Sequence, residues 1–208
     1  CGPDAVAGAH TPGKVLATDE FLYIADSGHH RVIECKHDGR IQRQFGSSDP
    51  GYWDGRDEQC GFRDPQGLAL RDDFLYVADR GNHCIRRMRL RGGDVETVLG
   101  TGEQGRVRPH EADPLVTPIG TPTGLAVVAD KLHVTSSSQN QVWELDLTRN
   151  RVNVLSGTGK RELIDGLSLE ASFAQPVGIA AIGMQLLVVD AASSAVRLIR
   201  LLDGRVST

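Results

Sequence analysis

The chain contains few of the residues that mark several protein classes. Only 4 of its 208 residues are cysteine, and aromatic residues make up 5% of it. There are too few cysteines for a small secreted fold held together by disulfide bonds; they are Cys1, Cys35, Cys60 and Cys84. None are spaced as C-x-x-C, which argues against a zinc knuckle and a dithiol redox motif. We interpret Cys35 and Cys84 as small buried apolar residues.

Long apolar runs are also missing. No stretch approaches the roughly 20 residues that a membrane-spanning helix needs, and no segment near the N-terminus resembles a signal peptide. A net charge of −4 gives no reason to expect a polyanionic partner. Because the chain begins at Cys1 rather than methionine, we expect a processed chain or a piece of a longer one. The composition predicts a soluble domain and leaves its compartment open.

The sequence does contain an internal repeat. LYIADSGHHRV at 22–32 returns as LYVADRGNHCI at 75–85, LHVTSSSQNQV at 132–142 and LLVVDAASSAV at 186–196. The prolines before these segments advance by 53, 57 and 54 residues, from Pro12 to Pro65, Pro122 and Pro176. The first aspartate column, Asp26, Asp79, Ser136 and Asp190, advances by the same steps. Landmarks that share one spacing indicate a true repeat.

Within each unit the apolar residues alternate with period two, which is typical of strands. Apolar residues three apart in the third segment, such as Val32 and Cys35, predict a bulge between them. No segment forms a convincing amphipathic helix. Units of about 50 residues with three to four short antiparallel strands predict an all-β fold, a β-propeller with four blades in this chain.

The motifs of the first two units carry a family resemblance. P-x-G-[LI]-A, L-Y-[IV]-A-D and N-H-x-I-R-R resemble the NHL repeat. More narrowly, PGYWDG, FRDPQGLAL and NHCIRR resemble the propeller of thioredoxin-linked NHL-repeat proteins, the family of NHL-repeat-containing protein 2 with its bacterial and plant relatives. The resemblance implies a ring of six blades, of which this chain holds part, and a preceding thioredoxin-like domain. We expect a linker or the end of a preceding segment at 1–11, then blades at 12–64, 65–121, 122–175 and 176–208.

The stretch DSGHHRVIEC at 26–35 looks like a metal or catalytic cluster. The repeat argues otherwise, because His30 aligns with His83 and then with Asn140 and Ser194. We therefore interpret Asp26, His30, Asp79 and His83 as structural positions whose side chains bond the backbone at a tight turn. We expect no metal and no cofactor there.

Candidate contact residues lie instead on the loops between blades, because the strands are committed to packing. In the first loop Tyr52 and Trp53 stand beside Asp54 and Arg56, and the matching positions of the third loop hold no aromatics. Aromatic and arginine side chains are enriched at interface hot spots. These four residues, with Arg106 and Arg108 of the second loop, are our candidates for binding a protein partner or an adjoining domain. The alternative for Trp53 is local packing against its own blade.

We predict a non-catalytic scaffold, without catalytic residues, and keep two alternatives. The first is a lyase-like or lactonase-like propeller enzyme with a metal in its channel, which needs ligands on inner strands where only Lys14 is charged. The second is an RNA-binding NHL domain, suggested by the basic run Arg86, Arg87, Arg89 and Arg91. A strand would divide that run between two faces, whereas RNA binding needs several cations on one face.

Overall fold

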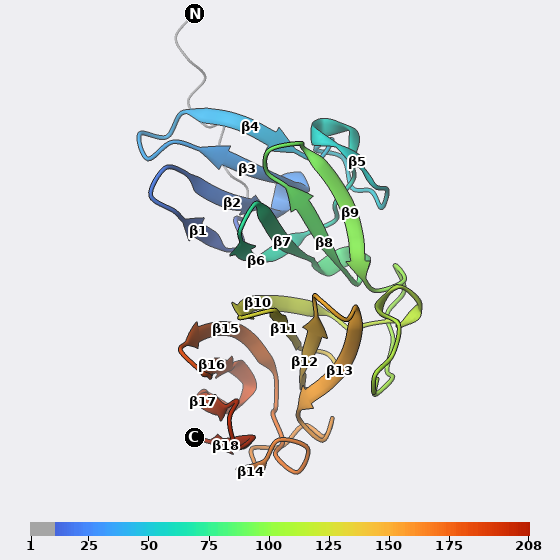
Figure 1. Cartoon of the computed structure of the whole chain (residues 1–208), viewed down its shortest axis with the longest axis vertical. Coiled ribbons are helices and arrows are strands. Elements are labelled where there is room, and N and C mark those ends of the chain that lie inside the picture. Colours follow the sequence, from blue (N-terminus) through green and yellow to red (C-terminus); the bar gives the residue numbers. More distant parts are fainter. Residues whose placement is uncertain (1–10) are drawn as a thin grey trace, which may run out of the picture.

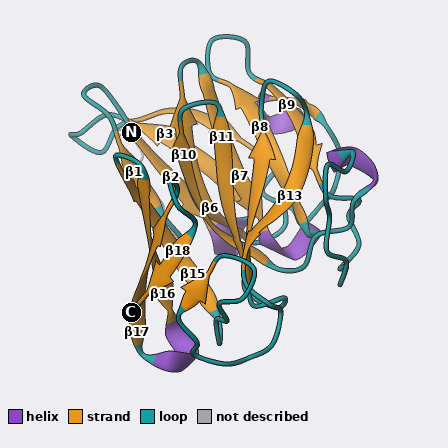
Figure 2. Cartoon of the chain, turned by 60° about the horizontal axis from the view of Figure 1, so that its bottom comes forward, coloured by secondary structure: helices purple, strands orange, loops and turns teal. Residues whose placement is uncertain are grey.

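The computed structural model describes residues 11–208, so Cys1 and most of the expected linker at 1–11 lie outside the described residues. The described chain forms four antiparallel sheets arranged as a fan, with the first strand of each sheet on the inside (Figure 1). The propeller fold predicted from the repeat spacing is confirmed. The described helices are 3-10 turns of three residues, seen as short coils between the strands (Figure 2). None of the described helices is long and apolar enough to cross a membrane.

Each sheet follows chain order from the inner to the outer strand. The first blade contains β1 (Val15–Ala17), β2 (Leu22–Asp26), β3 (Arg31–Cys35) and β4 (Ile41–Phe45). The second contains β6 (Pro65–Arg71), β7 (Phe74–Asp79), β8 (Cys84–Arg89) and β9 (Asp94–Leu99). The third contains β10 (Pro122–Val128), β11 (Lys131–Ser136), β12 (Gln141–Asp146) and β13 (Arg151–Ser156). The fourth contains β15 (Pro176–Ile182), β16 (Gln185–Asp190), β17 (Ala195–Arg200) and β18 (Arg205–Ser207).

The short turns are also repeated. The 3-10 turns are η1 (Ser27–His29), η2 (Asp57–Gln59), η3 (Arg80–Asn82), η4 (Pro114–Val116) and η5 (Ala191–Ser193). In the first, second and fourth blades a 3-10 turn joins the second strand to the third and ends at a left-handed residue. The register shifts between the third and fourth strands in the first three blades, with the extra residue on the fourth strand. The third strand pairs with the second without a shift, so the bulge expected within the third strand is wrong. Val32 and Cys35 are both buried because each blade packs on both faces.

Two sheets have a fifth strand, where we expected no more than four. The two-residue strands β5 (Gly55–Arg56) and β14 (Gly166–Leu167) leave the interblade loops and pair with the outer strands of the following blades. In the middle loop an isolated bridge joins Ala112 to Val152 of β13 in the same way. All three interblade loops therefore lie along the outer edge of the blade that follows them.

The apolar core lies between adjacent blades. Inner strand β10 contacts both β6 and β15, and the buried side chains form three clusters that join one blade to the next. Phe62 and Phe173, at matching positions of the first and third interblade loops, are fully buried in two of these clusters. Burying an aromatic ring of this size stabilises the fold by about 2 to 3 kcal/mol. Cys35, Cys60 and Cys84 are buried free thiols.

Candidate functional site

The buried aspartates of the second and fourth blades bind the backbone that leads into their own blade. Asp79 accepts the Arg63 backbone N–H at 2.8 Å and an N–H of the Asn82 side chain at 2.8 Å. In the fourth blade Asp190 accepts the Ala174 backbone N–H at 2.9 Å. Arg63 and Ala174 both stand two residues before the proline that begins the inner strand. The carboxylate therefore fixes the start of each of these blades.

The third blade makes the same attachment with different residues. Ser136 replaces the aspartate, and its hydroxyl donates to the Gln139 side-chain oxygen at 2.6 Å. That oxygen also accepts the Gly120 backbone N–H at 2.8 Å, two residues before Pro122. A neutral amide thus replaces a buried carboxylate here, so the position requires a hydrogen-bond acceptor rather than a charge.

The histidines of the repeat bind the interblade loop that leads into the following blade. Nδ1 of His30 accepts the Asp64 backbone N–H at 3.1 Å, whereas Nδ1 of His83 donates to the Gly120 carbonyl at 2.9 Å. The backbone φ angles of these histidines are 53° and 49°, in the left-handed region. Asp26 is buried, and its carboxylate pairs with Arg31 at 2.8 Å. Across residues 11–208, no three His, Cys, Asp or Glu side chains are grouped closely enough to hold a metal ion.

Asp54 binds Arg86, which belongs to the basic run of β8 and is fully buried. Nη2 of Arg86 donates to Asp54 Oδ1 at 2.8 Å and to the Trp53 carbonyl at 2.9 Å, while Nη1 donates to the Gly61 carbonyl at 2.8 Å. The Arg86 side chain is fully buried, and its guanidinium lies 5.3 Å from the centre of the Phe62 ring. Arg86 therefore holds both ends of the 53–61 loop against β8.

The fourth blade repeats this arrangement. Nη2 of the buried Arg197 donates to Asp165 Oδ1 at 2.8 Å and to the Ile164 carbonyl at 2.9 Å, and Nη1 donates to the Ser172 carbonyl at 2.7 Å. Its guanidinium lies 4.9 Å from the centre of the Phe173 ring. Both arginines follow their aspartate by 32 residues, which is the signal that could have identified the pairs from sequence.

Tyr52, Trp53 and Arg56 form an exposed surface on the first interblade loop, which we call the aromatic surface. Tyr52 is 42% exposed and Trp53 is 46% exposed. The Trp53 indole N–H donates to the Gln59 carbonyl at 3.0 Å, and its ring lies against Gly51. The Arg56 side chain is 66% exposed, 3.8 Å from Asp57. The Tyr52 ring lies against Gly102, with its centre 5.7 Å from the Arg86 guanidinium. Both rings are therefore partly packed and partly exposed.

The remaining candidates occupy the second interblade loop. Arg108 donates to the Thr158 carbonyl at 3.2 Å, so it connects this loop to the third one. Arg106 and Arg108 line a cavity of about 390 Å³ together with Gln139. Arg106 is exposed at its rim. The structure thus places these two arginines in a cavity between the second and third loops, a setting different from that of the aromatic surface.

The space inside the inner strands is lined by glycines together with polar and aliphatic side chains. Lys14 occupies the position that Gly67, Gly124 and Gly178 hold in the other blades. Its ammonium group donates to the Leu125 carbonyl at 3.4 Å, and burial lowers the pKa of Lys14. The cavity of about 490 Å³ around these positions also receives Arg80. Among its described lining residues there is no carboxylate or histidine to bind a cation.

Comparison with known proteins identifies the repeat. The model of the NHL repeat matches residues 62–88, which cover the aspartate and histidine columns of the second blade. The chain is an NHL-repeat β-propeller. It is 34% identical over 221 residues to NHL repeat-containing protein 2 of Homo sapiens, covering 94% of this chain and 30% of that protein. It is 33% identical to protein SUPPRESSOR OF QUENCHING 1, chloroplastic, of Arabidopsis thaliana, covering 93% of this chain and 19% of that protein. This NHL-repeat chain therefore spans less than a third of the curated relatives.

Solved structures support the fold. A Bacteroides thetaiotaomicron protein of unknown function superposes with a TM-score of 0.68 at 21% identity, covering 89% of this chain and 47% of that one. The virginiamycin B lyase of Staphylococcus aureus, in a catalytically inactive form with quinupristin, superposes with a TM-score of 0.62 at 15% identity. That match covers 94% of this NHL-repeat chain and 54% of the lyase. At these identities the likeness concerns the fold alone.

Proposed function

We propose that this propeller is a non-catalytic interaction module that holds a protein partner or an adjoining domain on its aromatic surface. The observation that carries the proposal is the half-exposed pair Tyr52 and Trp53 beside the exposed Arg56. Aromatic rings and arginine dominate interface hot spots, where truncation costs about 2 kcal/mol or more. The resemblance to thioredoxin-linked NHL-repeat proteins makes a thioredoxin-like domain the adjoining domain to test first.

The loop is held rigidly, which supports this role. Arg86 binds the Trp53 carbonyl and the Asp54 carboxylate, and the indole N–H binds Gln59. A surface whose side chains are already fixed loses little conformational entropy when a partner binds. Asp54 is committed to Arg86, so we assign contact to the aromatic surface and support to Asp54.

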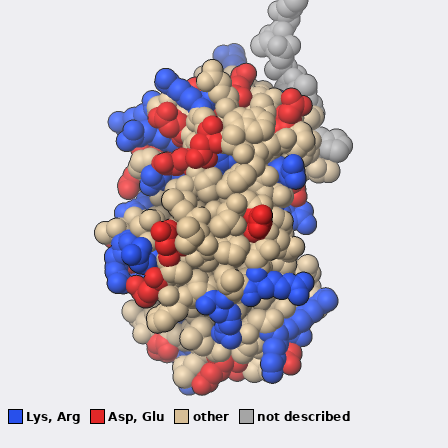
Figure 3. Space-filling model, turned by 90° about the vertical axis from the view of Figure 1, so that its right-hand side faces the viewer, with Lys and Arg blue, Asp and Glu red and all other residues tan. Residues whose placement is uncertain are grey.

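The charge distribution argues against an RNA-binding face. In the basic run of β8, Arg86 is buried and Arg87 pairs with Glu96 at 2.5 Å. Arg91 lies 3.5 Å from Asp73. In the view of Figure 3, basic and acidic side chains are mixed over the upper half of the face, and several basic side chains gather in the lower half. A surface that binds RNA phosphates needs several unpaired cations on one face.

Photo-crosslinking in the full-length protein tests the proposal. With benzoylphenylalanine at position 52, we expect crosslinks to a segment outside residues 11–208 or to a bound protein. The matched control is position 41, where the wild-type Ile41 is 39% exposed at the start of β4, the strand end away from this loop. The charge reversal Arg56→Glu should leave the melting temperature unchanged and reduce the crosslink yield at position 52. Equal crosslink patterns at positions 52 and 41, or no effect of the charge reversal, would refute the assignment.

A further inference from the structure

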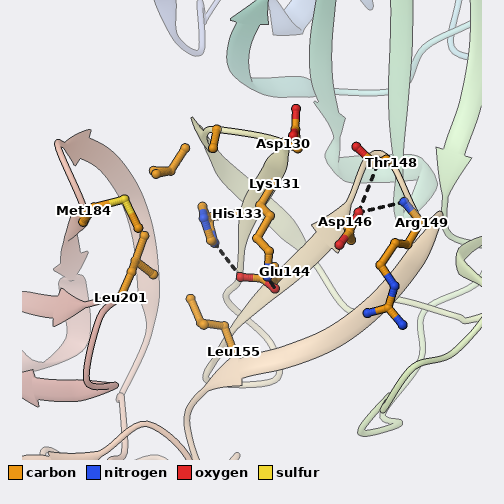
Figure 4. A pocket seen from close by; sticks show the side chains of 12 residues that line it. Asp130, Lys131, His133, Glu144, Asp146, Thr148, Arg149, Leu155, Met184 and Leu201 are labelled. Atoms are coloured by element: carbon orange, nitrogen blue, oxygen red, sulfur yellow. Dashed lines mark hydrogen bonds and ion pairs between the residues drawn. The ribbon is translucent and has the colours of Figure 1, made fainter.

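A cavity of about 470 Å³ lies between the third and fourth blades. It is at the end of the sheets where the first strand of a blade turns into the second and the third strand turns into the fourth. Figure 4 shows His133 and Glu144 at its floor, with Leu155 of β13 and with Met184 and Leu201 of the fourth blade around it. The volume is within the range of about 300 to 1,000 Å³ that small-molecule sites occupy. None of these residues belongs to the aromatic surface.

The cavity is found where the third blade departs from the repeat. In the first two blades the matching positions hold aromatic pairs, Phe21 with Tyr23 and Phe74 with Tyr76. Both tyrosines are buried, each in the apolar cluster that joins its blade to the following one. Tyr23 faces Glu34 across the strands, Tyr76 faces Arg87, and His133 faces Glu144 in the same register. Lys131 and His133 thus replace a Phe-Tyr pair, and one phenyl and one phenol ring are missing from this cleft.

His133 has hydrogen-bonding capacity that the described chain does not use. Its side chain is 1% exposed, and neither ring nitrogen has a hydrogen-bond partner among residues 11–208. Nδ1 lies 3.9 Å from Glu144 Oε2, too far for a direct hydrogen bond. Burial, followed by the charge of Lys131, lowers the pKa of His133 to about 4. The imidazole is therefore neutral at pH 7, with one donor and one acceptor nitrogen.

The charged groups around the cavity are already paired. Lys131 binds Glu144 Oε1 at 2.5 Å, and Arg149 lies 3.1 Å from Glu111. The other carboxylates at the rim also have partners: Asp130 pairs with Arg71, and Asp146 accepts the backbone N–H groups of Thr148 and Arg149. The unmet polar capacity is concentrated at His133, beside apolar walls. A ligand that fits is neutral and largely apolar, with one polar group at its inner end.

We propose that this cavity binds a small neutral molecule that carries a phenol ring. The ring lies between Leu155, Met184 and Leu201, in the space that the tyrosine column fills in the first two blades. The phenol oxygen reaches the His133 imidazole, as donor or acceptor according to the tautomer. The same chemistry could come from a free phenol or from a tyrosine side chain of a polypeptide.

Nuclear magnetic resonance of the histidine-labelled full-length protein tests the proposal, with p-cresol as the probe and toluene as its match without the hydroxyl. We expect p-cresol to shift the His133 ring signals saturably and to bind about ten-fold more tightly than toluene, as one added hydrogen bond gives. The His133 signal is assigned by its loss in His133→Tyr. The peptides acetyl-Gly-Tyr-Gly-amide and acetyl-Gly-Phe-Gly-amide form a second pair. Binding of the tyrosine peptide without p-cresol would locate the phenol in a polypeptide segment.

The variant His133→Tyr serves as the filled control. It restores the repeat residue, so it should fold, keep the melting temperature and lose p-cresol binding. If this variant fails to fold, His133→Phe replaces it as the control. The ratio of the affinities of the wild type for p-cresol and toluene still tests whether His133 binds the hydroxyl group. Equal affinity for p-cresol and toluene would reduce the site to an apolar crevice and overturn the proposal. The proposal is also overturned if neither p-cresol nor the tyrosine peptide, each added up to its own solubility limit, shifts the His133 ring signals. Persistence of p-cresol binding in His133→Tyr would overturn it as well.

Discussion

Replacing Arg86 by methionine should destabilise the propeller strongly. The Arg86 side chain is fully buried. The variant Arg86→Met keeps most of the side-chain volume but removes the donors to the carbonyls of Gly61 and Trp53 and the cation beside the buried Asp79, 3.4 Å away. Breaking a buried ion pair by removing one partner costs about 3 to 5 kcal/mol. For a domain of this size each kcal/mol lowers the melting temperature by about 2 to 4 °C, so we expect a loss of about 6 to 20 °C.

The neighbouring Arg87 provides the control. Its side chain is 34% exposed and pairs with Glu96 at the surface, so Arg87→Met should cost about 1 kcal/mol or less. Thermal unfolding followed by circular dichroism, together with urea unfolding, measures both variants against the wild type. Equal and small losses for the two variants would show that the buried guanidinium contributes no more than a surface charge. A double variant with Asp54→Asn should lose less than the sum of the two single losses, because the residues share one contact.

Further predictions follow from other buried groups. Because the pKa of His133 is about 4 in the fold and about 6.5 in the unfolded chain, the unfolded state binds more protons at this group, and its contribution to a fall from pH 7 to 5 is a loss of about 2 kcal/mol. Burial raises the pKa of Asp79 to about 6, which acts in the opposite direction in the same window, so the comparison is made between variants. Urea unfolding at both pH values should show a change in the wild type that is about 2 kcal/mol less favourable than in His133→Tyr; equal changes would assign the pH dependence to other groups. Phe173→Ala should cost about 3 to 5 kcal/mol by calorimetry, and a loss below 1 kcal/mol would place the ring outside the core. Gln139→Ala should cost about 1 to 3 kcal/mol and speed hydrogen exchange at the Gly120 amide; unchanged exchange would contradict the attachment.

The blade architecture could be predicted from sequence because one spacing is shared by prolines, aspartates and apolar columns. The edge strands β5 and β14 could not, since a strand of two residues has no alternation to detect. The burial of Arg86 was missed because an arginine in a basic run resembles a solvated charge, and only its loop partners show otherwise. The repeat alignment already placed His133 in a tyrosine column, but only the structure shows that the shorter ring leaves a cavity there.

The placement of each interblade loop along the outer edge of the next blade affects how the molecule meets other copies of itself. A bare edge strand offers unpaired backbone groups to any neighbouring chain and promotes aggregation. The outer strands β9, β13 and β18 are each covered in part, through Gly55, Ala112 and Gly166. Cleavage of the peptide chain within 101–121 would leave every blade intact in sequence but release the cover of β13. A nicked protein should therefore aggregate before it unfolds.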